Sequence, residues 1–94
     1  MYLSKNLTLA EVIKSQTALR NGIDNTPTIE HRNNLEILAR EIFQPIRDRF
    51  KSPIYISSGY RCKQLNDILR GSQTSHHLRG MAIDIDQDGR SNVT

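Results

Sequence analysis

The hydrophobic pattern is clearest in the middle of the chain, where apolar residues recur at steps of three or four between residues 27 and 50. This spacing places them on one face of an α-helix and predicts the central core helix of the fold. The residues expected to face the core are Leu35, Leu38, Ile42, Ile46 and Phe50. Thr26 and Pro27 fit the N-cap and first position of this helix. Pro45 lies inside the pattern, and we expect it to kink the helix or divide it, because its ring removes a hydrogen bond and crowds the preceding turn.

The N-terminal third predicts a shorter helix followed by a loop. Thr8 and Glu11 have the spacing of a capping box, in which each side chain accepts from a free backbone amide at the helix start. We expect a helix over roughly residues 9–20, stopped by Asn21-Gly22, and then a loop over residues 21–28. The apolar residues expected to be buried by this helix are Leu9, Val12, Ile13 and Leu19.

The C-terminal half predicts two strands with a helix between them. The segment "IYISS", residues 54–58, has the β-branched and aromatic content of a strand and ends at Gly59. Residues 62–70 have helical spacing through Leu65, Ile68 and Leu69, closed by Gly71. Residues 81–86 alternate as a strand does, with Met81, Ile83 and Ile85 toward the core and Ala82, Asp84 and Asp86 on the other side. The expected fold class is α+β.

Length and composition restrict the class of protein. The chain of 94 residues predicts one domain, 1–94, and its 36% hydrophobic residues are typical of a globular protein. The net charge of +3 is mild and its cations are scattered, so no nucleic-acid partner is predicted. Cys62 cannot form an internal disulfide and is expected to be packed. The sequence shows no secretory signal and no membrane span. We therefore expect synthesis in the cytoplasm. If the target lies outside the cell, another component must deliver the protein to it.

The segment "SHHLRGMAID", residues 75–84, contains candidate metal ligands. A catalytic zinc site takes about three protein ligands, commonly imidazole and carboxylate, and leaves a position open for water. His77 and Asp84 are suitable types, but seven extended residues would separate them by roughly 23 Å, so the chain must reverse between them. Gly80 can supply the reversal because it adopts conformations that other residues avoid. The alternative is a solvated loop containing His76 and His77, followed by a strand whose Asp84 faces water.

A calcium site is an alternative use of the same strand. The segment "DIDQDG", residues 84–89, matches the opening of a calcium-binding loop, with Asp84, Asp86 and Asp88 at its first, third and fifth positions. The glutamate required at the twelfth position would be residue 95, beyond Thr94, and a strand precedes the segment where an EF-hand has a helix. A solvated strand end and turn is the simpler explanation of these carboxylates.

The segment "SSGYR", residues 57–61, places an arginine directly after a strand end, where binding groups are frequent. The planar guanidinium of Arg61 could polarise a carbonyl or hold a carboxylate, and a surface arginine is the alternative. A G-x-S-x-G elbow, a phosphate-binding glycine loop and a C-x-x-C pair are all absent from the sequence, which excludes several other classes of enzyme.

Taken together, these segments resemble the zinc peptidases of the peptidase M15 family, which includes D-alanyl-D-alanine carboxypeptidases, dipeptidases and phage endolysins. The family's S-G-Y-R pattern is matched by residues 58–61. Its S-x-H-x-x-G-x-A-x-D pattern is matched by Ser75, His77, Gly80, Ala82 and Asp84. The resemblance implies a hedgehog/DD-peptidase-like fold, with N-terminal helices packed on a small antiparallel sheet. It also implies zinc-dependent hydrolysis of D-amino-acid-containing peptides in bacterial peptidoglycan.

The resemblance also implies roles for individual residues. His77 and Asp84 would be zinc ligands, and His76 would occupy a variable position. Arg61 would stabilise the negative oxygen that forms when a peptide carbonyl is attacked. Ser75 and Tyr60 would lie beside the bound substrate.

Part of the family pattern is missing. The family supplies a third ligand histidine and, shortly before it, a glutamate as general base, and neither residue type occurs after Asp84. His31 is the one histidine outside the motif and is expected on a solvated helix face. We therefore expect a truncated piece of a longer protein, with two of three ligands and no base. A non-catalytic cell-wall binding module and a calcium-stabilised domain are the alternative hypotheses.

Overall fold

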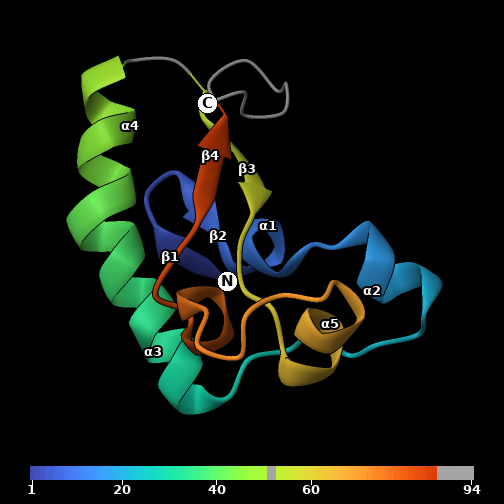
Figure 1. The fold of residues 1–94 in the computed structure, drawn as a ribbon. Coiled ribbons are helices and arrows are strands. Elements are labelled where there is room, and N and C mark those ends of the chain that lie inside the picture. The colour runs from blue at the N-terminus through green and yellow to red at the C-terminus, as the bar shows by residue number, and fades with distance from the viewer. Residues whose placement is uncertain (51–52, 87–94) are drawn as a thin grey trace.

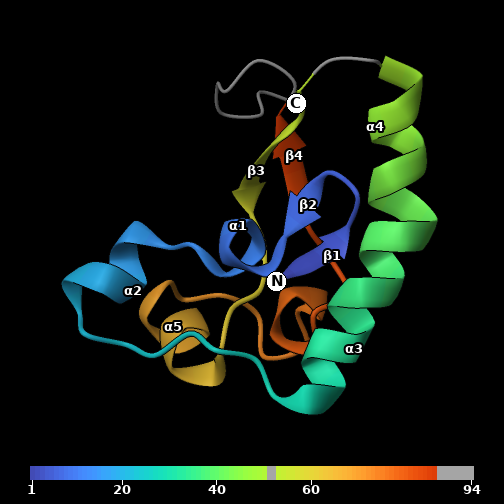
Figure 2. The same ribbon diagram turned by 180° about the vertical axis from the view of Figure 1, so that it is seen from behind.

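The computed structural model describes residues 1–50 and 53–86 and combines short strands with helices (Figure 1). The elements are β1 (Tyr2–Ser4), β2 (Leu7–Thr8), α1 (Leu9–Ile13), α2 (Gln16–Arg20), α3 (Ile29–Leu38), η1 (Ala39–Phe43), α4 (Gln44–Phe50), β3 (Tyr55–Ser58), α5 (Lys63–Ile68), η2 (His76–Arg79) and β4 (Asp84–Asp86). Both views show the long helix α3–α4 on one side of the strands and α2 and α5 on the other (Figures 1 and 2). This arrangement confirms the α+β class.

The N-terminal segment forms a strand pair and two short helices. The predicted capping box is confirmed, because Thr8 Oγ1 accepts from the Glu11 amide while the Glu11 carboxylate accepts from the Thr8 amide. The single helix expected over residues 9–20 is wrong. Lys14 is extended, and the Ser15 hydroxyl starts a second helix by accepting from the Ala18 amide. Ala18 is therefore the buried residue of α2, and Leu19 is 76% exposed.

The start of α3 lies two residues later than predicted. Thr28 is the N-cap, since its hydroxyl accepts from the His31 amide, and Pro27 lies in the loop before it. Thr26 instead bonds to the Asp24 carboxylate through its amide and its hydroxyl. These bonds lower the pKa of Asp24. The predicted cap, Thr26, is therefore engaged within the loop, and the helix begins after Thr28.

The long helix continues past Pro45 through a π-helical turn, so it is neither interrupted nor divided. In η1 the Gln44 amide bonds to the Ala39 carbonyl, one residue further back than in an α-helix. The turn that precedes the proline ring is therefore widened. The buried residues of the helix are Leu35, Ala39 and Phe43, with Ile46 partly buried. Ile42 and Phe50 are 52% exposed, which corrects two of the predicted core positions.

The second sheet consists of β3 and β4, which pair antiparallel. Ile56 faces Ile85 and Ser58 faces Asp84, with an irregularity between the two pairs. Both predicted strands are therefore found, although the second begins at Asp84 rather than at residue 81. Ile83 and Ile85 pack against the core as predicted. Met81 is 51% exposed, because the chain is still leaving the η2 turn at that position.

Only one of the three apolar residues predicted to be buried by helix α5 is buried. Leu65 is buried, but Ile68 and Leu69 are almost half exposed. The left-handed residue after the helix is Arg70, with φ of 56°, and not the expected Gly71. Gly71 is required for another reason, since a Cβ there would collide with the Asn66 side chain.

The core consists of two clusters. The main cluster comprises Leu3, Leu7, Val12, Leu35, Ala39, Phe43, Ile54 and Tyr60. The second comprises Ala18, Ile23 and Leu65, and the free cysteine Cys62 packs against both clusters, as expected of a packed thiol. Within the described ranges, every helix is too short or too polar to span a lipid bilayer.

Candidate metal centre

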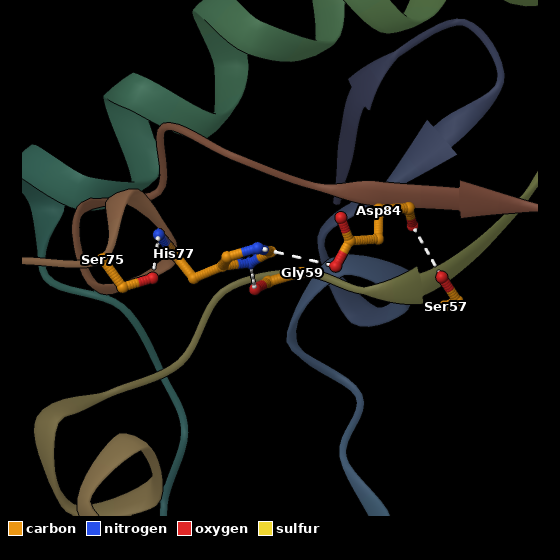
Figure 3. Close-up of polar contacts among 5 residues, drawn as sticks. All are labelled: Ser57, Gly59, Ser75, His77 and Asp84. Carbon is orange, nitrogen blue, oxygen red and sulfur yellow. Dashed lines mark hydrogen bonds and ion pairs between the residues drawn. The ribbon is translucent and has the colours of Figure 1, made fainter. Parts of the chain in front are cut away.

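The predicted ligands His77 and Asp84 lie next to one another. His77 projects from η2 and Asp84 from the start of β4, and the two side chains point toward each other in Figure 3. The distance from His77 Nε2 to Asp84 Oδ2 is 3.6 Å. The His77 side chain is 12% exposed and that of Asp84 is 57% exposed, so the ring is packed while the carboxylate is open to solvent. The expected chain reversal between them is therefore present.

The orientation of His77 is set by the end of β3. Its Nδ1 lies 2.7 Å from the Gly59 carbonyl oxygen, as Figure 3 shows. A carbonyl can only accept, so Nδ1 carries a hydrogen. In the neutral form of the ring the lone pair is then on Nε2, the atom that faces Asp84. A carbonyl that fixes the tautomer in this way is a common second partner of metal-binding histidines. On the other side, the Ser57 hydroxyl donates to the Asp84 carbonyl at 3.2 Å.

The spacing of the S-x-H-x-x-G segment has a local cause. The Ser75 hydroxyl caps η2 by accepting from the His77 amide, two residues later, at 3.3 Å. Gly80 ends the turn with φ of 72°, in the left-handed region. A Cβ at this position would also collide with the His31 carbonyl and lie 2.9 Å from Leu35 Cγ. Glycine is therefore required both by the turn and by the contact with α3.

The SSGYR segment is held tightly against the N-terminal half. Gly59 passes so close to the Val12 carbonyl that a Cβ would collide with it, and the Tyr60 amide donates to the same carbonyl at 2.9 Å. The buried Asn25 donates to the carbonyls of Ile13 and Tyr60 and accepts from the Cys62 amide. From the sequence, Asn25 was expected only to lie in a loop, and no local signal marks its role as a bridge between backbone segments.

Comparison with protein families matches this chain to the peptidase M15 model over residues 5–94. The chain belongs to the peptidase M15 family. The comparisons with curated proteins and with solved structures gave no match. The family match covers the sequence motifs and the His77–Asp84 pair described above.

Of the other residues that the family resemblance selected, Arg61 is joined to His77 by its backbone. Its amide donates to the His77 carbonyl at 3.1 Å. Its guanidinium extends toward Gly71, and its buried Nε has no hydrogen-bond partner among the described residues. Arg61 also lines a cavity of about 440 Å³ with Ser57 and Gly59, the residues that bond to Asp84 and His77. His77 and Asp84 do not themselves line this cavity.

In this M15 chain Tyr60 contacts an unexpected residue, His31. The Tyr60 ring is 5% exposed, and burial raises the pKa of its hydroxyl. The hydroxyl lies 3.2 Å from His31 Nδ1, with the ring centroids 5.6 Å apart. His31 is therefore half-buried, and its predicted solvated position is wrong. Because 29 residues separate the two side chains, no spacing rule could have paired them.

The separation of His77 and Asp84 in this M15 chain fits two candidate ligands of one zinc ion, as far as the described residues extend. Two atoms bound to one tetrahedral zinc at about 2.0–2.1 Å lie about 3.3 Å apart, close to the observed His77–Asp84 separation. Imidazole and carboxylate are also suitable donors for zinc. No group of three or more such ligands occurs among residues 1–50 and 53–86. For the calcium alternative, the Asp86 side chain and Asp88 lie outside the described residues.

Proposed function

We propose that this M15 chain takes part in zinc-dependent hydrolysis of peptide bonds in bacterial cell-wall peptidoglycan, on peptides that contain D-amino acids. The observation that carries the proposal is the pairing of His77 Nε2 with Asp84 Oδ2 at 3.6 Å, within a chain of the peptidase M15 family. The packed ring and the open carboxylate would leave one side of the pair accessible to substrate.

The residues around the pair would have distinct tasks. His77 and Asp84 would hold zinc, which when bound lowers the pKa of water and polarises a peptide carbonyl. The Gly59 carbonyl keeps the His77 tautomer that leaves Nε2 free. Arg61 would stabilise negative charge on the substrate oxygen, an electrostatic role that is effective in a site with little water. Ser75 and Tyr60 would lie beside the substrate.

Hydrolysis needs in addition a third ligand and a general base. The described residues hold neither beside His77 and Asp84. Metal binding and hydrolysis therefore require separate measurements, because two protein ligands can bind zinc weakly without activating water for attack.

Calorimetric titration with zinc tests the metal assignment. We expect His77→Ala and Asp84→Asn each to abolish zinc binding, because each removes one of two ligands. His76→Ala is the matched control, and its binding should equal that of the unmodified chain. Loss of binding in His76→Ala with retention in His77→Ala would refute the assignment. Binding of calcium in place of zinc would instead support the calcium-stabilised domain.

Digestion of purified peptidoglycan, with analysis of the released peptides, tests the reaction. Zinc-dependent release of peptides that is absent in His77→Ala would support hydrolysis and show which bond is cut. Binding to peptidoglycan without any release would favour the non-catalytic cell-wall module, and the proposal of hydrolysis would fail for this chain.

A further inference from the structure

Asn66 of α5 is a fully buried polar side chain, with an exposed fraction of 0%, and none of the roles assigned above uses it. Its Nδ2 donates to the Ser72 carbonyl at 3.1 Å. Because a carbonyl can only accept, the amide nitrogen must face Ser72, and Oδ1 points away from it. Oδ1 is buried and has no hydrogen-bond partner among residues 1–50 and 53–86. A buried acceptor of this kind costs free energy and requires an explanation.

The guanidinium of Arg61 has the complementary deficit. Its Nε is a donor, and it is also buried without a partner in the described part of the chain. Gly71 lies between the two groups, since a Cβ on Gly71 would collide with Asn66 Oδ1 and lie 3.3 Å from Arg61 Nη1. A buried acceptor and a guanidinium with an unused donor therefore border the same glycine.

We infer that Asn66 is a positioning residue for Arg61. Its Oδ1 accepts a hydrogen bond from the guanidinium, and this bond fixes the direction in which Arg61 presents its other donors. Gly71 has no side chain to separate the two groups, so a rotation of the long Arg61 side chain closes the contact. The effect on hydrolysis rests on the proposed function, whereas the contact rests on the burial and placement of the two groups alone.

A neutral amide is suited to this task. A carboxylate would also hold the guanidinium, but it would offset the positive charge on which stabilisation of an oxyanion depends. The amide oxygen accepts a hydrogen bond and carries no net charge. The cavity of about 440 Å³ that Arg61 lines has no aspartate or glutamate on its wall. The charge of Arg61 is therefore available to a substrate oxygen in that cavity.

The donor end of Asn66 reaches the segment that presents His77. The Ser72 carbonyl accepts from Asn66 and also from the Ser75 amide, at 3.1 Å. The Ser75 hydroxyl in turn accepts from the His77 amide. One buried side chain thus links the loop before His77 with the glycine beside the Arg61 guanidinium.

NMR of the Arg61 guanidinium in the zinc-free chain tests the contact without catalysis. A guanidinium held by hydrogen bonds shows separate signals for its two Nη groups, whereas a free one rotates and its signals merge. We expect separate signals in the unmodified chain. Asn66→Leu removes the acceptor and should abolish the separation. Asn66→Asp keeps an acceptor oxygen but loses the donor to Ser72, and it should retain the separation.

The two variants distinguish positioning of Arg61 from support of the loop, because both lose the bond to Ser72. Merged signals in both variants would show that Asn66 only supports the loop, and the inference would fail. Separate signals in Asn66→Leu would also overturn it. Asn33→Leu, at an exposed asparagine of α3, is the matched control and should leave the Arg61 signals unchanged.

Arg61→Met tests the same contact with Asn66 intact, so the test remains decisive if Asn66→Leu does not fold. A hydrogen bond to an amide oxygen polarises the amide, so its loss should move the Asn66 Nδ2 hydrogens to lower frequency. Arg20→Met, at an exposed arginine of α2, is the control and should leave these signals in place. Unmoved Asn66 signals in Arg61→Met would contradict the contact.

Peptidoglycan digestion separates failure of the contact from failure of the proposed function. Asn66→Asp should release peptides at least about tenfold more slowly, with unchanged zinc affinity, because the carboxylate offsets the Arg61 charge. An unchanged rate would overturn the role of Asn66 in the reaction. If the unmodified chain releases no peptide while the Arg61 signals behave as expected, the proposed function fails and the contact between Asn66 and Arg61 stands.

Discussion

Single glycines decide how closely the segments of the candidate site approach one another. Gly80 has a left-handed backbone and also lies against the His31 carbonyl, whereas Gly22 has a similar φ of 64° with nothing within 4 Å of an added Cβ. An alanine at position 22 would therefore have only the cost of the left-handed backbone, whereas an alanine at position 80 would have the cost of a steric collision in addition. This difference gives a matched pair of substitutions.

We expect Gly22→Ala to lower the free energy of unfolding by about 1 kcal/mol, the cost of a left-handed alanine. Gly80→Ala should lower it by more than about 2 kcal/mol, because the collision with α3 adds to that cost. It should also weaken zinc binding by displacing η2. Urea unfolding of both variants measures the difference, and equal losses would contradict the described contact between Gly80 and α3.

Tyr60 predicts a dependence of stability on alkaline pH. Burial raises its pKa in the folded state above the ordinary value of about 10. The unfolded chain therefore loses this proton first as the pH rises, and the free energy of unfolding falls above about pH 10. Below that pH the contribution of Tyr60 is fully present.

Tyr60→Phe should show a smaller decrease of stability between about pH 9 and pH 11, because it lacks the titrating hydroxyl. Tyr2→Phe, at a tyrosine that is 70% exposed, is the matched control and should keep the decrease of the unmodified chain. Unfolding curves across this pH range measure both. An unchanged slope in Tyr60→Phe would contradict the burial of its hydroxyl.

At the scale of the elements, the π-turn η1 determines which residues of the long helix reach the core. Phe43 is 1% exposed in the main cluster, and its neighbour Ile42 is 52% exposed. The predicted stripe contained Ile42 and not Phe43, because it assumed regular α-helical spacing. The widened turn before Pro45 changed that register.

Phe43→Ala is expected to cost about 3–5 kcal/mol of stability, because it removes a fully buried aromatic side chain. Ile42→Ala should change stability by less than about 1 kcal/mol, as is usual at exposed positions. Thermal or urea unfolding of the two neighbours compares them directly. Similar losses at both positions would contradict the π-turn register and favour the regular helix.

At the scale of the whole molecule, Asn25 joins the two halves of the chain. Its side chain bonds to Ile13 in the N-terminal half and to Tyr60 and Cys62 in the segment that leads to the candidate site. Three backbone groups thus depend on one buried amide. Through Gly59 the same segment supports His77.

Asn25→Ala should cost about 3 kcal/mol, because it leaves these backbone groups without their partner in a buried position. Asn21→Ala is the control, since its exposed amide makes one bond to the Thr17 carbonyl and should cost less than about 1 kcal/mol. Urea unfolding measures both variants. An equal effect would show that Asn25 is replaceable by water.

Features built from neighbouring residues were predictable from the sequence. The capping box of Thr8 and Glu11 and the turn at Gly80 depend on contacts within a few residues, which sequence spacing encodes directly. The strand β3 was predictable from the β-branched and aromatic residues of its own segment, although its partner β4 lies far along the chain. The pairing of His77 with Asp84 was expected from the resemblance to the M15 family, because the spacing alone left a solvated loop as the alternative.

Only the tertiary structure decided the features that join distant residues. It placed His31 against Tyr60 and buried Asn25 between the end of α1 and the segment after β3. It also buried Phe43 in place of Ile42. The reason is that packing favours complementary shape and satisfied hydrogen bonds regardless of separation along the chain. It also gathered Arg61 and Asn66 beside one glycine. The sequence by itself determined the candidate ligand types and the local turns. The fold decided the surroundings of these residues, since the surroundings depend on contacts across the whole chain.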